Sequence, residues 1–294
     1  MFIRIRHTLS YTYDRPVFFE PMTVRLTPRQ DPTQRLVEHE LRFSPEPTGS
    51  TWCVEQDGTA ARTCWFSDKH ASLTIETSSV VETLRDNPFD ALITHEPCAA
   101  LPAAYPAELA RVLRPAIEDE IDPDVRAWAA SIAEASSHGT MDFLTNLTDR
   151  IFTDCRMVTR DDGNPMTPAQ TLAEQEGACR DVAMLFIAAC RSQGLAARFV
   201  SGYSIHGPPE ITEQELHAWA EVYLPGAGWR GYDPSLGLAT SDGHVALASS
   251  PAHELAAPTS GSYRGTGTSS RMAYTITIDS ADTLMTLQSA SHNK

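Results

Sequence analysis

The chain has 294 residues, 41% of them hydrophobic, which is enough for a sizeable core and predicts two structural units. The formal net charge of −15 argues against a nucleic-acid surface and against binding to anionic membranes. The N-terminal residues alternate charged and apolar side chains instead of forming a secretion signal, and no apolar stretch reaches membrane length, so we expect a cytoplasmic protein. The cysteines show no CxxC spacing, which indicates reduced thiols, and no His/Cys cluster has metal-ligand spacing; we therefore expect no metal and no cofactor.

Residues 1–105 have the pattern of an antiparallel β domain. Apolar and polar residues alternate along residues 3–13, and turn sequences rich in Pro, Gly and Asp separate the segments that follow. The further candidate strands are residues 22–26, 36–43, 51–56, 63–66 and 72–82. Several short strands at this spacing favour a sandwich or a barrel. A stretch rich in Pro and Ala over residues 87–106 links this domain to the next unit.

Residues 106–258 predict a unit that contains both helices and strands, so the fold class of the whole chain is α+β. Asp122 before Pro123 is typical of a helix N-terminus, and an apolar stripe indicates another helix over residues 140–152. Residues 167–170 have the pattern of a capping box, which predicts a further short helix.

The stretch around Cys179 predicts a nucleophile. A run of apolar residues over 182–190 is too long and too rich in Ala, Leu and Met for a strand; it predicts a helix buried on all sides that ends near Gly194. Cys179 would lie in the first turn of this helix, where unpaired backbone N–H groups and the positive end of the helix dipole stabilise a thiolate. The alternative interpretation is core packing, which we expect for Cys190 in the same helix.

Two partners for this thiol follow in a predicted hairpin. Residues 217–224 alternate with period two, and His217 lies on their polar face. Residues 225–228 have the sequence of a turn, and the proline after Asp233 holds that residue extended at the end of the next strand. The hairpin would place His217 beside Asp233, and a thiol, an imidazole and a carboxylate form the triad of acyl transfer. Taken singly, the imidazole fits a structural role and the carboxylate fits a turn.

Four motifs of this unit occur in order. They are Gly-x-Cys-Arg-Asp-x-Ala at residues 177–183, Ala-Ala-Arg-Phe-Val-Ser-Gly-Tyr at 196–203, His-Ala-Trp-x-Glu-Val-Tyr at 217–223 and Gly-Trp-x-x-Tyr-Asp-Pro at 228–234. This series closely resembles the transglutaminase-like superfamily of papain-type cysteine enzymes. The resemblance implies a papain-like core, with the nucleophile at a helix N-terminus packed on an antiparallel sheet, and Cys179, His217 and Asp233 as the catalytic residues.

The first hundred residues resemble the N-terminal domain commonly joined to bacterial transglutaminase-like enzymes. The matching residues are His7-Thr8, Tyr11-x-Tyr13, Pro16-Val17, Arg25-Leu26-x-Pro28-Arg29 and Asp57-Gly58. The same resemblance would return a C-terminal strand, residues 271–279, to this domain. Residues 259–270 are rich in Ser, Thr and Gly and predict a flexible linker, and residues 280–294 predict a poorly ordered tail.

Three functions are compatible with this sequence. The first is a thiol hydrolase, a cysteine protease or amidase, that cuts peptide or isopeptide bonds; the second is a protein-glutamine amine acyltransferase that crosslinks or transamidates; the third is a catalytically idle binding module. The presence of all three triad residues disfavours the third, and the lack of a calcium-loop pattern disfavours a calcium-triggered crosslinker. The polar segment 204–214 predicts an open cleft, which favours water over amines as the acceptor. We therefore expect hydrolysis of a peptide or protein substrate through a thioester.

Other residues near the triad have less defined roles. The Cys179 backbone N–H is the expected oxyanion donor, and the sequence does not identify a second. Trp219 and Trp229 are the nearest aromatic candidates for walls of the substrate site, although a strand tryptophan is more often part of a core. Arg180 and Asp181 are assigned no chemical step, because an acid in the first turn of a helix is already explained by the helix dipole. The sequence specifies no oligomeric state.

Overall fold

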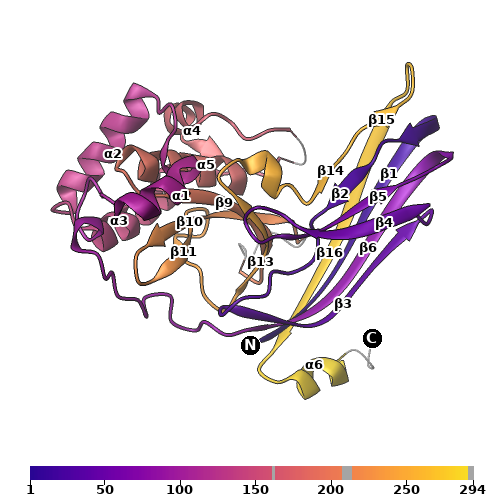
Figure 1. The fold of residues 1–294 in the computed structure, drawn as a ribbon, viewed down its shortest axis with the longest axis horizontal. Coiled ribbons are helices and arrows are strands. Elements are labelled where there is room, and N and C mark those ends of the chain that lie inside the picture. Colours follow the sequence, from indigo (N-terminus) through magenta and orange to yellow (C-terminus); the bar gives the residue numbers. More distant parts are fainter. Residues whose placement is uncertain (161–162, 207–213, 291–294) are drawn as a thin grey trace.

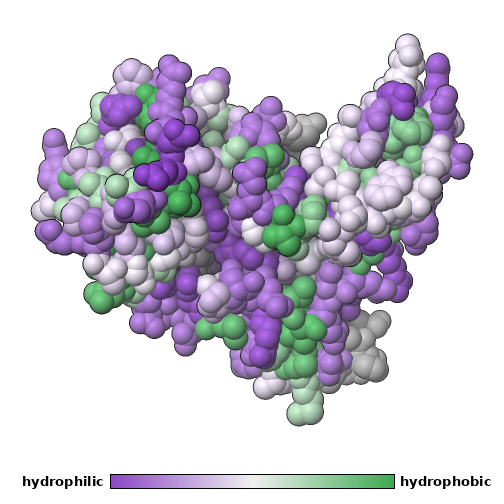
Figure 2. Space-filling model, in the orientation of Figure 1, coloured by the Kyte–Doolittle hydropathy of each residue, from purple (hydrophilic) through white to green (hydrophobic). Residues whose placement is uncertain are grey.

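Helices and strands divide the molecule into two lobes that lie side by side (Figure 1). The computed structural model describes residues 1–160, 163–206 and 214–290. Most helices gather in one lobe, at the left of the view, and long antiparallel strands form the other, at the right. A notch separates the lobes at the upper edge of the molecular surface (Figure 2). Within the described residues, no helix combines the length and the apolar character needed to cross a membrane.

The β lobe consists of two antiparallel sheets. The larger sheet contains β1 (Phe2–Phe19), β3 (Gln34–Ser44), β6 (Lys69–Thr83), β15 (Tyr263–Arg264) and β16 (Ser270–Ala281). The smaller sheet contains β2 (Met22–Val24), β4 (Gly49–Val54), β5 (Ala60–Trp65) and β14 (Thr259–Ser260). Alternate apolar residues of both sheets, such as Ile3, Ile5 and Val24, face one shared core. The predicted antiparallel β domain is therefore confirmed, in the form of a sandwich.

The last part of the chain returns to the β lobe. β16 pairs with β1 at twelve consecutive positions, so the two ends of the chain form neighbouring strands (Figure 1). Residues 259–270, predicted as a linker, contain β14 and β15, which pair with β2 and β1. In the predicted tail, helix α6 (Leu284–Ala290) buries Leu287, whose carbonyl oxygen accepts a hydrogen bond from Arg4 at 2.8 Å. The composition of residues 259–270 predicts a loop, but β14 and β15 form there because their backbone groups pair with strands that lie far away in the sequence.

The other lobe packs helices against a five-stranded antiparallel sheet. Its helices are α1 (Ala107–Ile117), α2 (Pro123–Ala135), α3 (Thr140–Asp154), α4 (Pro168–Glu174) and α5 (Cys179–Ser192). The sheet has the order β12 (Leu238–Ala239), β11 (Gly228–Asp233), β10 (His217–Leu224), β9 (Ala197–Ser204) and β13 (His244–Ser250). The short elements are η1 (Glu96–Cys98), the paired β7 (Arg156–Met157) and β8 (Glu176–Gly177), and η2 (His253–Ala256). α5 contacts β9 and β10 as well as α2, α3 and α4, and is therefore the central element.

The central helix α5 is buried as its composition predicts. Its residues from Leu185 to Cys190 are all buried in the core of the helical lobe. The helix ends at Ser192, and Gly194 follows with φ of 76°, a left-handed conformation that glycine adopts without strain. The other predicted helices also form, and Thr167 and Gln170 complete the capping box at the start of α4.

Strand β13 is not among the strands expected from the sequence. All of its residues are buried, because the strand lies between the two lobes. Val245 and Leu247 join the core of the β lobe, whereas Ala248 joins the core of the helical lobe. A strand buried on both faces shows no alternation of apolar and polar residues, and the small Ala and Ser side chains of β13 further weaken its signal.

A buried ion cluster joins the lobes at Glu221 of β10. Glu221 Oε1 lies 2.7 Å from Arg29 Nη2 of the β lobe, and Oε2 lies 2.6 Å from Arg198 Nη2 of β9. Burial alone raises the pKa of Glu221, but the two guanidinium groups outweigh it and lower the pKa to about 2. Beside this cluster, the Gln34 side chain exchanges two hydrogen bonds with the backbone of Ala246 in β13. The β lobe is thus fixed against the sheet that carries the predicted imidazole.

Candidate active site

The first turn of α5 carries Cys179 and is held by the carboxylate of Asp181. Ala178 donates its backbone N–H to Asp181 Oδ2 at 2.7 Å, and Met166 donates its N–H to Oδ1 at 2.8 Å. Arg160 Nη1 lies 2.8 Å from both carboxylate oxygens. Asp181 is fully buried and fully paired, so it is a structural anchor that fixes the turn and thereby the position of the thiol.

Two glycines permit close approaches around this turn and the strand that faces it. A Cβ atom on Gly177 would lie 2.8 Å from the Cβ atom of Asp181, and one on Gly202 of β9 would lie 2.5 Å from the Trp219 ring. Trp219 therefore packs directly on Gly202, and its ring centroid lies 6.2 Å from that of His217. The indole supports the imidazole from the buried side of the site.

His217 begins β10 and Asp233 ends the neighbouring strand β11, as the hairpin pattern predicts. His217 Nε2 lies 2.6 Å from Asp233 Oδ2. Ser235 donates its backbone N–H at 3.1 Å and its hydroxyl at 2.6 Å to Asp233 Oδ1, and His244 Nε2 lies 3.1 Å from Oδ2. Burial alone raises the pKa of Asp233, but His217 and His244 outweigh it and hold the pKa far below its usual range. The carboxylate therefore stays ionised at neutral pH and orients both imidazoles.

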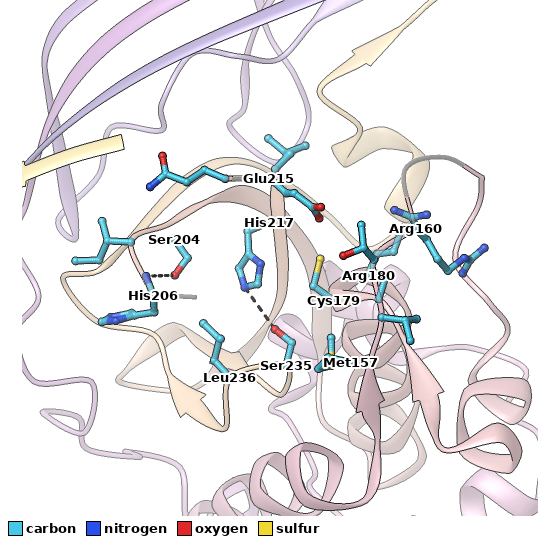
Figure 3. A pocket seen from close by; sticks show the side chains of 16 residues that line it. Met157, Arg160, Cys179, Arg180, Ser204, His206, Glu215, His217, Ser235 and Leu236 are labelled. Atoms are coloured by element: carbon cyan, nitrogen blue, oxygen red, sulfur yellow. Dashed lines mark hydrogen bonds between the residues drawn. The ribbon is translucent and has the colours of Figure 1, made fainter. Parts of the chain in front are cut away.

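Cys179 and His217 face each other across the site (Figure 3). With Nε2 directed at Asp233, Nδ1 is the ring nitrogen available to the Cys179 sulfur. Burial alone lowers the pKa of His217, but Asp233 and Cys179 outweigh it and raise the pKa well above its ordinary value. A protonated imidazole thus lies beside a sulfur at a helix N-terminus, where unpaired N–H groups and the helix dipole stabilise negative charge.

Two cavities, each of about 390 Å³, meet at the thiol, and Cys179 and His217 line both. The first, here called the strand-side cavity, has polar groups from Ser204, Gln214 and Ser235 in its wall (Figure 3). The second, here called the interface cavity, extends from the thiol to β1 and β16 of the β lobe. A substrate could therefore reach the sulfur from two sides.

The two tryptophans expected as site walls lie elsewhere. Trp219 is buried behind the imidazole, because the alternation of β10 directs it toward Gly202. Trp229 stacks under the Arg198 guanidinium, 4.1 Å from the ring centroid, and contacts Tyr223 edge-on at 5.3 Å. In the part of the chain that the structure describes, neither indole lines either cavity.

Comparison with known proteins places this fold in a family. Residues 3–82 match the bacterial transglutaminase-like N-terminal region, and residues 126–234 match the transglutaminase-like superfamily. A protein of Mycobacterium tuberculosis is 31% identical over 247 residues, which cover 79% of this chain and 78% of that protein. The chain belongs to the transglutaminase-like superfamily.

Two further matches extend over most of the chain. A protein of Mycobacterium leprae is 25% identical over 270 residues, covering 90% of this chain and 94% of the relative; both mycobacterial proteins are described as uncharacterized. A solved structure from Cytophaga hutchinsonii, described as a candidate cysteine protease, superposes with a TM-score of 0.70 over 96% of this chain and 92% of that one, at 19% identity. The two proteins therefore share the fold of both lobes.

Three contributions to this transglutaminase-like site lie outside the predicted triad. Ser235 follows Asp233 by two residues, the spacing at which an Asp side chain commonly bonds the backbone, so a local signal was present. Asp181 occupies the acidic position of a capping box, but its pairing with Arg160 depends on a loop that only the fold brings there. His244 has no local signal at all, because it begins β13, the strand whose pattern is hidden.

His217, Asp233 and His244 also form a group that could hold a metal ion, since one ligand atom from each lies within 4.8 Å of the others. Residue spacing alone predicts no such site, because the three residues belong to three different strand ends. The N–O distances of 2.6 and 3.1 Å are those of hydrogen bonds. An ion would require both ring nitrogens to lose the protons that they direct at Asp233, so the arrangement favours proton-bearing imidazoles.

Proposed function

We propose that the protein is a cysteine-dependent amide hydrolase that acts on peptide or protein substrates through a thioester. The observation that carries this proposal is the position of His217, whose ring faces the Cys179 sulfur (Figure 3) and whose Nε2 lies 2.6 Å from Asp233 Oδ2. A thiol, an imidazole that exchanges a proton with it and a carboxylate that orients the imidazole are the parts that covalent acyl transfer needs.

The reaction has two half-reactions. In the first, the Cys179 sulfur attacks the amide carbonyl carbon; a C–S bond forms, the C–N bond breaks, and His217 donates its proton to the departing amine. In the second, His217 accepts a proton from water as the water oxygen attacks the thioester carbonyl, and the C–S bond breaks to release a carboxylic acid. The Cys179 backbone N–H, at the start of α5, supports the oxyanion in both steps.

Water is the proposed acceptor because the thiol is partly exposed and opens onto the strand-side cavity. Hydroxyl and amide groups of Ser204, Gln214 and Ser235 in its wall suit a hydrated site, whereas transamidation needs water to be excluded from the thioester. Residues 207–213, which are part of the segment that predicts an open cleft, lie outside the described residues.

The partition of the thioester tests this proposal. The protein would be incubated with a library of peptide amides and a primary amine at millimolar concentration, and free acid would be measured against new amide. We expect mainly free acid, none of it from Cys179→Ala. Cys190→Ala is the matched control, because burial raises the pKa of the Cys190 thiol and keeps it inert. If the product is mainly amide, the protein is an acyltransferase. If the protein is well folded but shows no turnover, it is a binding module.

A further inference from the structure

The interface cavity has one wall from each lobe. The helical lobe contributes Cys179 and His217, and β1 and β16 of the β lobe contribute the opposite wall. The residues of these two strands that line it are His7, Leu9, Tyr11, Met272 and Tyr274. The two strands are neighbours in register, so residues from opposite ends of the chain form one continuous surface that faces the thiol.

This β-lobe wall is mainly apolar and aromatic, and it includes two tyrosines. Leu9 pairs across the strands with Tyr274, and Tyr11 pairs with Met272. The Tyr11 hydroxyl lies 2.9 Å from Thr259 Oγ1, which fixes the ring in place. A volume of about 390 Å³ lies within the range of ligand-binding pockets, which are typically apolar with a few placed polar groups.

Two histidines that line this cavity, one from each lobe, each have a buried ring nitrogen that lacks a hydrogen-bond partner among the described residues. His7 is 2% exposed, and its Nδ1 lies 2.9 Å from the Tyr203 hydroxyl, but its Nε2 is unpaired. His253 Nε2, from η2 on the other lobe, is also buried and unpaired. Burial lowers the pKa of His7 to about 4, so the ring is neutral at pH 7. A buried polar group without a partner is unfavourable, so a ligand with a carbonyl or an amide N–H would be favoured here.

We propose that the interface cavity binds a bulky apolar side chain of the peptide substrate, aromatic in preference, next to the amide that Cys179 attacks. The peptide backbone of the same residue would supply the polar group that faces His7. The occupant is a peptide because the cavity opens directly at the thiol and combines an aromatic wall with unpaired imidazoles. This inference rests on the proposed function and assigns substrate selection to Tyr11 and Tyr274 of the β lobe.

Binding to a protein that cannot react tests the inference separately from turnover. In the Cys179→Ala protein, calorimetry would compare blocked dipeptide amides with Phe or Ala at the variable position. We expect the Phe peptide to bind at least about tenfold more tightly, as expected for burial of an aromatic side chain. Adding Tyr11→Ala or Tyr274→Ala should remove this preference, whereas Tyr11→Phe should keep it. Equal binding of both peptides, or a preference that survives both alanine variants, would overturn the inference.

Tyr13→Ala is the matched control, because Tyr13 lies on the same strand but packs against Phe19 and Tyr263, away from the thiol. Turnover then separates the two proposals. If the Phe peptide binds with the expected preference but wild-type protein cleaves nothing, the proposed function fails and the binding site stands. If wild-type protein cleaves Phe and Ala peptides with equal kcat/KM, the cavity does not select the substrate and the proposed function stands.

Discussion

Two buried carboxylates lie on neighbouring strands of the same sheet and differ in the groups that bind them. Asp233 in β11 is bound by the imidazoles of His217 and His244, whereas Glu221 in β10 is bound by two guanidinium groups. In both cases the partners outweigh burial and lower the pKa of the carboxyl group. A guanidinium keeps its proton at any working pH, whereas an imidazole exchanges it near neutrality. The same arrangement therefore joins the two lobes at Glu221 and suits proton transfer at Asp233.

The largest effect is expected when the imidazole-bound carboxylate of Asp233 loses its charge. Asp233→Asn keeps the volume of the side chain but removes the charge that fixes the His217 tautomer, so we expect kcat to fall by about 10⁴-fold, as for the equivalent change in a serine protease triad. Initial rates and a thermal melt would show lost turnover in a folded protein. The control is Asp242→Asn, because the Asp242 side chain accepts a hydrogen bond from the neighbouring Ser241 hydroxyl, and this variant should keep full activity. If Asp233→Asn turns over substrate at nearly the wild-type rate, Asp233 is a turn residue and not part of the triad.

Removing the charge of the guanidinium-bound carboxylate, Glu221, should lower the stability of the protein and leave its kcat unchanged. Glu221→Gln leaves the buried Arg198 without its counter-charge and leaves Arg29 with Asp31 alone, which should cost about 3 kcal/mol of unfolding free energy. The kcat of the molecules that remain folded should stay close to that of wild type. Denaturant unfolding would measure the loss. The control is Glu118→Gln, because Glu118 forms an exposed pair with Arg114 at 3.9 Å and should contribute little.

The pH dependence of stability sharpens the same comparison. The pKa of Glu221 is about 2 in the folded protein, below its ordinary value of 4.5, so its stabilising contribution is fully present above pH 4.5 and is lost as the pH falls toward 2. Wild-type protein should therefore lose more stability across this window than Glu221→Gln does. Equal losses in the two proteins would assign the acid sensitivity to other carboxylates.

The contrast between Asp233 and Glu221 also shows which contacts local sequence patterns can predict. Cys179, His217 and Asp233 could be placed together because a helix start and a short hairpin are local structures with strong residue patterns. The alternation of β10 also places Trp219 on the His217 face, but it does not say whether that face is open or packed on Gly202. Partners that come from distant parts of the chain leave no local pattern. Arg29, 192 residues before Glu221, is such a case.

His244 is a second long-range partner, and removing it tests whether Asp233 needs both imidazoles. Burial lowers the pKa of His244, so a neutral ring donates from Nε2 to Asp233. His244→Phe keeps the ring but removes a hydrogen bond to a charged group, worth about 1.5–3 kcal/mol, so we expect kcat to fall by roughly 10- to 100-fold with KM unchanged. His244→Gln, which can donate an amide N–H, should recover part of the rate. An unchanged kcat in His244→Phe would leave His217 as the one imidazole that matters to Asp233.

The smallest expected effect concerns metal ions at the same three side chains. His217, Asp233 and His244 could coordinate an ion, but their hydrogen bonds already use the atoms that would bind it. Dialysis against a chelator should therefore leave kcat unchanged within error. Added Zn²⁺ should inhibit, because thiolate and imidazole are its preferred ligands and an ion on Cys179 and His217 would block attack on the amide. The opposite pattern, in which chelation abolishes turnover and Zn²⁺ restores it, would mean that Asp233 holds a metal ion and does not orient a proton-bearing imidazole.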